Sequence, residues 1–261
     1  MKFWRVYLLG LRMGMRDWTF FWTWRSWLGG WMLRLVCSIL LWSLMGKMMG
    51  STETLRYLLI GNAVTAGIGT FIVASCCWDR MEGTYSLLVA APASLVPLFL
   101  GRPSIWAFGW VASALLSTAL VSFGFDLALP WKGLAVLPLL IVIVSVSTFF
   151  CTAFVGTMVA ATAPQARNIA NNWLLILFSA ICGINVPTAF WPKWVQIVAT
   201  ALPITHGLEA IRIVLSGGGM MEALPQVGLE LAVGAAWLIV ILCTLDRMTD
   251  RARIKGTIDF A

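Results

Sequence analysis

The sequence predicts an all-α membrane protein, with an N-terminal interfacial amphipathic helix, six transmembrane helices and an external re-entrant helical hairpin between spans five and six. Of its 261 residues, 60% are apolar and only 11% are charged. Soluble domains contain roughly 45–50% apolar and about 25% charged residues. This imbalance excludes an ordinary soluble enzyme, an intrinsically disordered chain and a nucleic-acid-binding module.

Six apolar runs have the length that a bilayer requires. A hydrocarbon core about 30 Å thick is crossed by a helix of about 20 residues. The candidate spans are Trp27–Gly46, Tyr57–Trp78, Ser104–Gly124, Leu134–Ala161, Ile169–Val186 and Val227–Leu245. They define a single transmembrane domain over residues 27–261, which follows a helix over residues 1–26.

The distribution of lysine and arginine predicts the orientation, because cytoplasmic loops carry an excess of both. With both termini in the cytoplasm, twelve of the 18 Lys and Arg residues lie inside and five lie outside, while Arg34 falls within the first span. Residues 246–261 then form a cytoplasmic tail. The net charge of +7 therefore follows from topology and requires no nucleic-acid partner.

The first 26 residues predict a helix that lies in the membrane interface. Bulky apolar side chains recur at helical spacing along one face, at Trp4, Leu8, Leu11, Met15, Trp18 and Trp22. Arginines form a stripe beside that face, at Arg5, Arg12 and Arg16. A helix of this kind binds anionic lipid headgroups through its basic stripe, so membrane lipid is an expected partner.

The loop after the second span, residues 79–92, is either a solvated connector or a short amphipathic helix across the cytoplasmic face. Acidic residues near its start favour a helix N-terminus. Apolar residues then repeat at helical spacing until Pro92 ends the pattern. The candidate interaction residues of this loop are Asp79, Arg80, Glu82, Gly83, Thr84, Tyr85 and Leu88.

Residues 187–224 are too polar and too interrupted to form a span, yet too apolar for a free loop. The pattern predicts one helix beginning near Pro192, a break at Pro203, and a second helix with Thr205 as its N-cap. Two broken helices of this kind are typical of a re-entrant hairpin, whose backbone must be satisfied by protein or by a water-filled cavity.

The second helix of this hairpin carries His206, Glu209 and Arg212. Glu209 and Arg212 are three residues apart and can face each other. They either pair with each other and stabilise the hairpin or contact a substrate. His206 is expected to be a hydrogen-bond partner at the helix terminus or, alternatively, a ligand or proton relay.

Two further groups of residues are candidates for a substrate path. Trp27, Trp31, Arg34 and Ser38 follow one line along the first span. This line is either an aromatic belt with a snorkelling arginine or an inward-facing stripe. Asn171 and Asn172 near the start of the fifth span either face the pore or a second copy, or else cap the helix on the cytoplasmic side.

The sequence contains no motif for chemistry within this chain. A Walker A loop needs Gly-Lys followed by Ser or Thr, but the one Gly-Lys pair, Gly46-Lys47, precedes Met48. The six cysteines lie in apolar runs and there is a single histidine, so no protein-built metal site is expected. An integral-membrane enzyme would need a polar catalytic cluster at one depth, and none is found. We therefore predict no catalytic residue, metal or bound cofactor.

The chain resembles the membrane permease subunits of ABC type-2 exporters, which include polysaccharide, lipo-oligosaccharide and drug exporters. The order of the predicted elements is one similarity. The stretch Arg80 to Thr84, followed by Pro92, is similar to the family's R-x-x-G-T pattern with a later proline. The run from Leu202 to Arg212 is similar to the external motif L-P-x-T-H-x-x-E-x-x-R. The resemblance covers essentially the whole chain.

The resemblance implies an export mechanism and its partners. The permease would pair with a second copy or a close paralogue, and each would bind a separate ATP-binding subunit that holds ATP and Mg²⁺. Residues 79–92 would be the coupling helix that docks on that subunit. The implied substrate is amphipathic or lipid-linked, such as a saccharide-lipid, and it would leave the cytoplasm by alternating access across a bacterial inner membrane. A drug or antibiotic efflux permease is the alternative within the family, and a non-transporting membrane scaffold is a third possibility.

Overall fold

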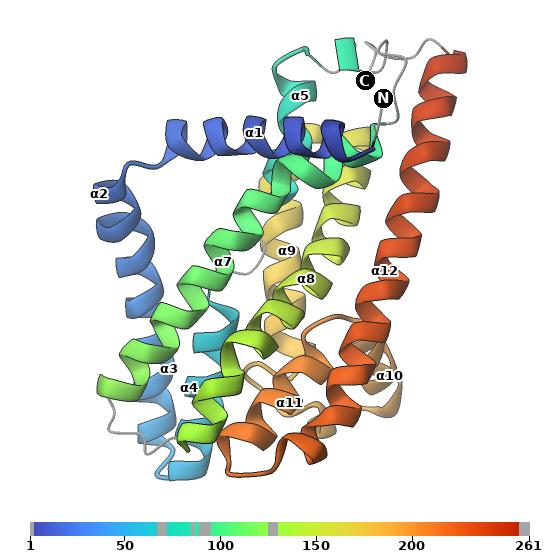
Figure 1. Ribbon diagram of the computed structural model, residues 1–261. Helices are drawn as coiled ribbons and strands as arrows, with labels where there is room; N and C mark the ends of the chain where they lie inside the picture. Colours follow the sequence, from blue (N-terminus) through green and yellow to red (C-terminus); the bar gives the residue numbers. More distant parts are fainter. Residues whose placement is uncertain (1–2, 67–71, 85–86, 89–94, 125–129, 256–261) are drawn as a thin grey trace.

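The structure is a computed structural model that describes residues 3–66, 72–84, 87–88, 95–124 and 130–255. Within these ranges the regular elements are helices, so the predicted all-helical class is confirmed. Most of the long helices run side by side, whereas α1 (Phe3–Phe21) lies across their ends (Figure 1). We call this the α1 end of the bundle. The opposite end, where α10 (Lys193–Ala201) and α11 (Thr205–Leu215) lie, is the hairpin end.

Four helices among the described residues are long and apolar enough to cross a membrane: Trp24–Met48, Val96–Gly124, Gly133–Thr162 and Met220–Leu245. They match predicted spans one, three, four and six. The first combines α2 (Trp24–Ser26), a π-helical stretch η1 (Trp27–Met32) and α3 (Leu33–Met48), and the others lie in α7 (Val96–Gly124), α8 (Trp131–Thr162) and α12 (Met220–Lys255).

The remaining two predicted spans are not single long helices. The second is divided between α4 (Thr52–Thr65) and α5 (Ile72–Met81), with residues 67–71 outside the described part. The fifth corresponds to α9 (Arg167–Ile181), which has only 15 residues and follows a short 3₁₀ turn, η2 (Pro164–Ala166). The predicted count of six spans is therefore not confirmed, although α4 and α5 lie toward opposite ends of the bundle (Figure 1).

Two glycines of α1 allow this helix to pack closely against α7. Gly10 and Gly14 are the buried residues of α1. A Cβ on Gly10 would lie 2.8 Å from the carbonyl oxygen of Leu98, and one on Gly14 would overlap the carbonyl of Arg102. Backbones approach this closely only where no side chain stands between them. The contact face of α1 is thus centred on glycine, and the predicted stripe of bulky residues lies beside it, with Trp4, Leu8 and Met15 exposed.

The turn between α1 and the first long helix is fixed by a capping box. The Thr23 N–H donates to Ser26 Oγ at 2.9 Å, and the Ser26 N–H donates to Thr23 Oγ1 at 3.2 Å. This reciprocal pair satisfies backbone donors that a helix start otherwise leaves open. The chain therefore leaves α1 and enters the bundle at a defined residue.

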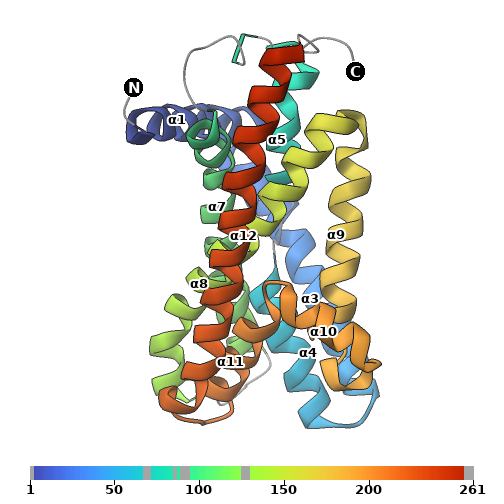
Figure 2. The same ribbon diagram turned by 90° about the vertical axis from the view of Figure 1, so that its right-hand side faces the viewer.

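The hairpin end contains a sharp bend between α10 and α11, whose axes differ by 89°. The pair is preceded by the 3₁₀ turn η3 (Thr188–Phe190). By length and composition it is either one broken span or a re-entrant loop. Figure 2 shows α11 beside the lower part of α12, which continues past the predicted end of span six and into the predicted tail as far as Lys255.

Candidate functional site

A buried arginine joins three elements at the α1 end. Arg102 on α7 donates from Nε to Asp17 Oδ2 on α1 at 2.7 Å and from Nη1 to Asp79 Oδ1 on α5 at 2.5 Å. Nη2 is 3.3 Å from Asp17 Oδ1, so the contact with Asp17 is bidentate. Arg102 and Asp79 are each only 5% exposed. We call Asp17, Asp79 and Arg102 the Arg102 cluster.

Aromatic rings surround this cluster. The guanidinium carbon of Arg102 lies 5.6 Å from the centroid of the Trp78 ring. Trp106 lies 4.9 Å from Trp18 and 5.9 Å from Trp78, measured between ring centroids. The Arg102–Asp79 pair is buried among these rings, and charge pairs interact more strongly at a lower local dielectric. The Arg102 cluster therefore connects α5 to α1 and α7.

The predicted interaction loop begins directly beside the cluster. Asp79 and Arg80 belong to the last turns of α5, and the Thr84 hydroxyl lies 3.3 Å from Asp79 Oδ1. Glu82 and Gly83 are exposed, and Gly83 turns the chain with a φ of +70°. Leu88 is half-buried in a helical conformation. The candidate Tyr85 lies outside the described residues, as does most of the stretch up to Pro92.

At the hairpin end, a buried carboxylate on α12 holds the start of α11. Glu230 is 0% exposed. It accepts hydrogen bonds from the backbone N–H of Ile204 at 3.0 Å and of Gly207 at 2.9 Å, and also from the Ser147 hydroxyl of α8. Ile204 is the N-cap of α11, and Gly207 is its third residue. One carboxylate from another helix thus supplies both bonds of a capping box.

This arrangement corrects the prediction that Thr205 caps α11. Thr205 is the first residue of the helix, and its hydroxyl donates to the carbonyl of Ala199 in α10 at 2.7 Å. Ile204 precedes it with a φ of +86°, a value that is rare for a β-branched residue. Pro203, in the break between the helices, is buried. Glu230 therefore caps the start of α11, while Thr205 links α11 to α10 across the bend.

A polar cavity of about 270 Å³ lies between α4, α10, α11 and the start of α12. We call it the polar cavity. It is lined by Tyr57, Cys182, Gly183, Thr188, Thr200, Thr205, His206, Glu209, Arg212 and Gln226. Three predicted hairpin residues, His206, Glu209 and Arg212, are thus brought together with residues far away in the sequence.

Arg212 has backbone partners in the structure. Its Nη2 donates to the carbonyl oxygens of Tyr57 and Ile184, each at 3.3 Å, and its guanidinium carbon lies 3.4 Å from the centroid of the Tyr57 ring. His206 Nδ1 is 2.9 Å from Gln226 Oε1, and its Nε2 is 3.2 Å from the Thr200 carbonyl oxygen. The predicted role of His206 as a hydrogen-bonding residue at the helix start agrees with these distances.

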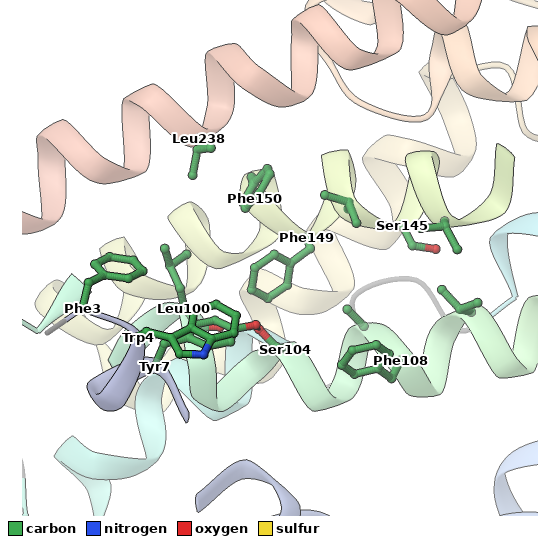
Figure 3. A pocket seen from close by; sticks show the side chains of 14 residues that line it. Phe3, Trp4, Tyr7, Leu100, Ser104, Phe108, Ser145, Phe149, Phe150 and Leu238 are labelled. Carbon is green, nitrogen blue, oxygen red and sulfur yellow. The ribbon is translucent and has the colours of Figure 1, made fainter. Parts of the chain in front are cut away.

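A second cavity, of about 380 Å³, lies near the α1 end and is apolar; we call it the apolar cavity. Figure 3 shows Phe3, Trp4 and Tyr7 of α1 on one side, with Phe108 of α7, Phe149 and Phe150 of α8 and Leu238 of α12 around the same space. Its few hydroxyl groups are already bonded. Tyr7 pairs with Ser104 at 3.0 Å, and Ser145 donates to the Ile141 carbonyl at 2.7 Å.

The predicted path residues of the first span differ in burial. Trp31 is half-buried and donates from Nε1 to Ser113 Oγ of α7 at 3.2 Å, and Trp27 packs between α3 and α4. Arg34 and Ser38 are exposed on the outer side of α3. The Arg34 guanidinium carbon lies 4.7 Å from the centroid of the Trp31 ring.

The asparagines near the start of α9 are separated from that stripe. Asn172 is exposed, whereas Asn171 is half-buried and its Oδ1 has no hydrogen-bond partner among the described residues. Helix α9 packs on α5 and α8, while α3 packs mainly on α4. Within one chain, the described residues therefore do not combine these two candidate groups into a single site.

A match to a protein-family model identifies the family of this chain. The model of the ABC-2 type transporter matches residues 12–216, which is most of the chain and extends from α1 to the end of α11. The chain belongs to the ABC-2 type transporter family. The predicted resemblance to ABC type-2 permeases is thus confirmed. No curated protein with which the chain was compared matches it.

Family membership assigns a general role to this permease. ABC-2 permeases are the membrane components of transporters that work with an ATP-binding ABC subunit. The four long apolar helices agree with a multi-pass integral membrane protein. Both the Arg102 cluster and the hairpin fall within the matched residues. They are therefore features of the transport domain itself.

The sequence analysis missed two of the three charges that form the Arg102 cluster of this permease. Arg102 falls between predicted spans two and three, and neither it nor Asp17 was singled out, because nothing local indicates that they pair with Asp79 across three helices. Glu230 is an acidic residue inside the predicted span Val227–Leu245. Its unfavourable position in a bilayer was a signal that a buried partner exists, but which backbone amides it binds depends on tertiary structure.

Proposed function

We propose that this chain is the permease subunit of an ATP-driven exporter that moves an amphipathic or lipid-linked substrate, such as a saccharide-lipid, out of the cytoplasm. The observation that carries this proposal is the apolar cavity beside α1. Its lining offers ring faces and aliphatic groups, which suit an acyl or polyprenyl chain. Its place next to a helix with membrane-interface character suits a substrate that enters laterally from the bilayer.

The proposed orientation puts the α1 end in the cytoplasm of a bacterium and the hairpin end outside its inner membrane. Arg5, Arg12 and Arg16 are exposed along α1. Basic residues near the bilayer surface favour the cytoplasmic side and anionic lipid. In this orientation α10 and α11 form the external re-entrant hairpin.

ATP and Mg²⁺ would bind to the partner subunit, and the exposed turn at Glu82 and Gly83 would dock on it. Behind this turn, the Arg102 cluster connects α5 to α1 and α7. A force applied at the turn would reach the transport helices through these short ion pairs. Movement between inward-open and outward-open states then requires only that ATP binding favour one of them.

A second permease would complete the path. The apolar outer side of α3 is exposed at Leu33, Leu40, Leu41 and Leu44, each by more than 40%. We propose that this side faces a second copy or a close paralogue, with Arg34 and Ser38 near the contact. Substrate would then pass between the two permeases.

Drug efflux is the second candidate function within the family. In the part of the chain that the structure describes, no charged residue lines the apolar cavity, which would also accept an apolar drug. Reconstitution of the permease with its ATP-binding subunit in proteoliposomes separates the two functions. We expect ATP-dependent movement of a fluorescent lipid-linked saccharide, and movement of a hydrophobic dye alone would favour the alternative. Failure to bind any ATP-binding subunit would contradict both.

Two paired variants sharpen this test. Val146→Trp fills the apolar cavity and should reduce transport, whereas Leu139→Trp, an exposed position on the same helix outside the cavity, should not. Glu82→Arg should uncouple ATP hydrolysis from transport, whereas Glu53→Arg at the opposite end of the bundle should leave coupling intact. Normal transport by Val146→Trp would remove the apolar cavity from the path.

A further inference from the structure

We propose that the polar cavity is a saccharide site at the exit of the permease, where it holds one sugar unit of the exported molecule. The inference rests on the proposed function, since it names the part of the substrate that this cavity recognises. With about 270 Å³, the cavity is near the lower end of the volumes of ligand pockets, roughly 300–1,000 Å³. It offers room for a small polar group rather than for a long chain.

The directions of the hydrogen bonds indicate which chemistry the cavity accepts. The hydroxyls of Tyr57, Thr200 and Thr205 each donate to a backbone carbonyl, at 2.7, 2.8 and 2.7 Å. A hydroxyl that has used its proton still has acceptor lone pairs. What these three residues offer to a ligand is therefore acceptor oxygen, so a ligand that binds them must bring hydrogen-bond donors.

Glu209 adds a stronger acceptor to the same wall. It is an exposed residue of the cavity lining, and an ionised carboxylate is an acceptor only. Sugar hydroxyls donate well to carboxylates, and such charge-assisted bonds are about twice as strong as neutral ones. Phosphate and carboxylate ligands, which have few donors or none, are disfavoured by the same group.

Arg212 makes the cavity close to neutral. Its Nη2 is engaged by two backbone carbonyls, and its guanidinium lies against the Tyr57 ring. The positive charge offsets that of Glu209, which disfavours a cationic amine relative to an uncharged polyol. Among donor-rich ligands, the charges therefore favour a neutral sugar.

The walls of the cavity are held in place by the hairpin itself. His206 connects α11 to Gln226 of α12 and to the Thr200 carbonyl of α10. Glu230 fixes the start of α11 from α12 and α8. Acceptors at fixed positions lose little conformational freedom when a ligand binds. A movement of the hairpin would dissolve this arrangement and release the sugar.

Saturation-transfer difference NMR on the purified permease tests the proposal. The protein is placed in phosphatidylcholine nanodiscs, which carry no sugar headgroup. The probes are glucose, galactose, mannose, rhamnose and N-acetylglucosamine, with ethanolamine as a cationic and methylphosphonate as an anionic comparator. We expect signals from at least one sugar and from neither comparator.

Three variants assign the signal to the cavity. Glu209→Gln and Thr205→Val should each weaken sugar binding, the first by about tenfold because a bond to a charged acceptor is lost. Glu222→Gln, the same change at an exposed residue of α12 outside the cavity lining, should bind like the native chain. The thermal unfolding midpoint of each variant is measured first. Binding is then compared only for variants whose midpoint equals that of the native protein.

The outcomes separate this proposal from the proposed function. No sugar signal, an equal signal in Glu209→Gln, or stronger binding of either comparator would overturn the saccharide site. The binding measurement needs no ATP-binding subunit. If ATP-driven export is observed but the polar cavity gives no sugar signal, the proposed permease function therefore remains intact. Sugar binding in a permease that fails to couple to any ATP-binding subunit would instead contradict only the exporter.

Discussion

The two ends of the bundle bury charge in different ways. At the α1 end, Arg102 is neutralised by two carboxylates on two other elements. At the hairpin end, the carboxylate of Glu230 is bonded by two backbone amides and a hydroxyl. The first arrangement joins side chains whose positions can change together. The second binds one helix directly to the backbone at the start of another.

This difference suggests different mechanical roles. Ion pairs between side chains can lengthen or exchange partners while each helix stays intact, which suits the end proposed to receive the ATP-binding subunit. A carboxylate bonded to the N-cap and third residue of a helix is tied to that helix's start. We therefore interpret the Arg102 cluster as a transmitting joint and Glu230 as an anchor for the hairpin.

The largest expected loss of stability comes from Arg102→Met. This change leaves Asp79 buried without its cationic partner, and breaking a buried ion pair costs about 3–5 kcal/mol of unfolding free energy. Thermal or denaturant unfolding in detergent measures the effect. Arg16→Met, which removes an exposed arginine of α1, serves as the control and should be within about 0.5 kcal/mol of the native protein. Equal stability of the two variants would show that the Arg102 cluster is not a stabilising joint.

Glu230→Ala tests the anchor at the hairpin end. We expect the unfolding free energy to fall by about 3 kcal/mol. The amides of Ile204 and Gly207 would lose their common acceptor inside the protein. Because the anchor acts on α11, hydrogen exchange should rise first over residues 204–208, whereas the α1 end stays protected. Exchange that rises equally at both ends would contradict the distinction between joint and anchor.

Gly14→Ala tests the close contact between α1 and α7. We expect the unfolding free energy to fall by about 1–2 kcal/mol, although alanine has a better helix propensity than glycine. The new Cβ would overlap the carbonyl of Arg102. Gly29→Ala is the matched control, because a Cβ there meets nothing within 4 Å. We expect the control to be neutral or slightly more stable in the same unfolding measurement. A neutral Gly14→Ala would show that α1 is docked loosely.

The smallest effect on stability is expected for Arg34→Leu, which changes an exposed side chain of α3. The unfolding free energy should change by less than about 0.5 kcal/mol. If Arg34 faces the substrate path, transport at matched membrane levels should fall in Arg34→Lys and fall further in Arg34→Leu, since lysine keeps the charge but lacks the planar fork. Full transport by Arg34→Leu would assign the residue to a snorkelling anchor.

Periodicity and motifs in the sequence determined the helical class, the four longest apolar helices and the family. Apolar length and the hairpin motif are local properties of a chain that must satisfy its backbone in lipid, so they can be recognised without neighbours. The bend between α10 and α11 was likewise predicted near Pro203, because proline interrupts a helix wherever it lies.

Only the tertiary structure decided which helix faces meet and where the buried charges find partners. The bulky stripe of α1 was expected to lie in the membrane interface, but no local pattern indicated that Gly10 and Gly14 form the close contact with α7, because close backbone approach depends on what the opposite helix offers. Threonine is a favoured N-cap residue, which led to the prediction for Thr205. The acceptor that caps α11 is instead Glu230, which lies 26 residues after Ile204 in the chain. Pairing across such distances depends on the geometry of packed helices, which no local pattern of residues encodes.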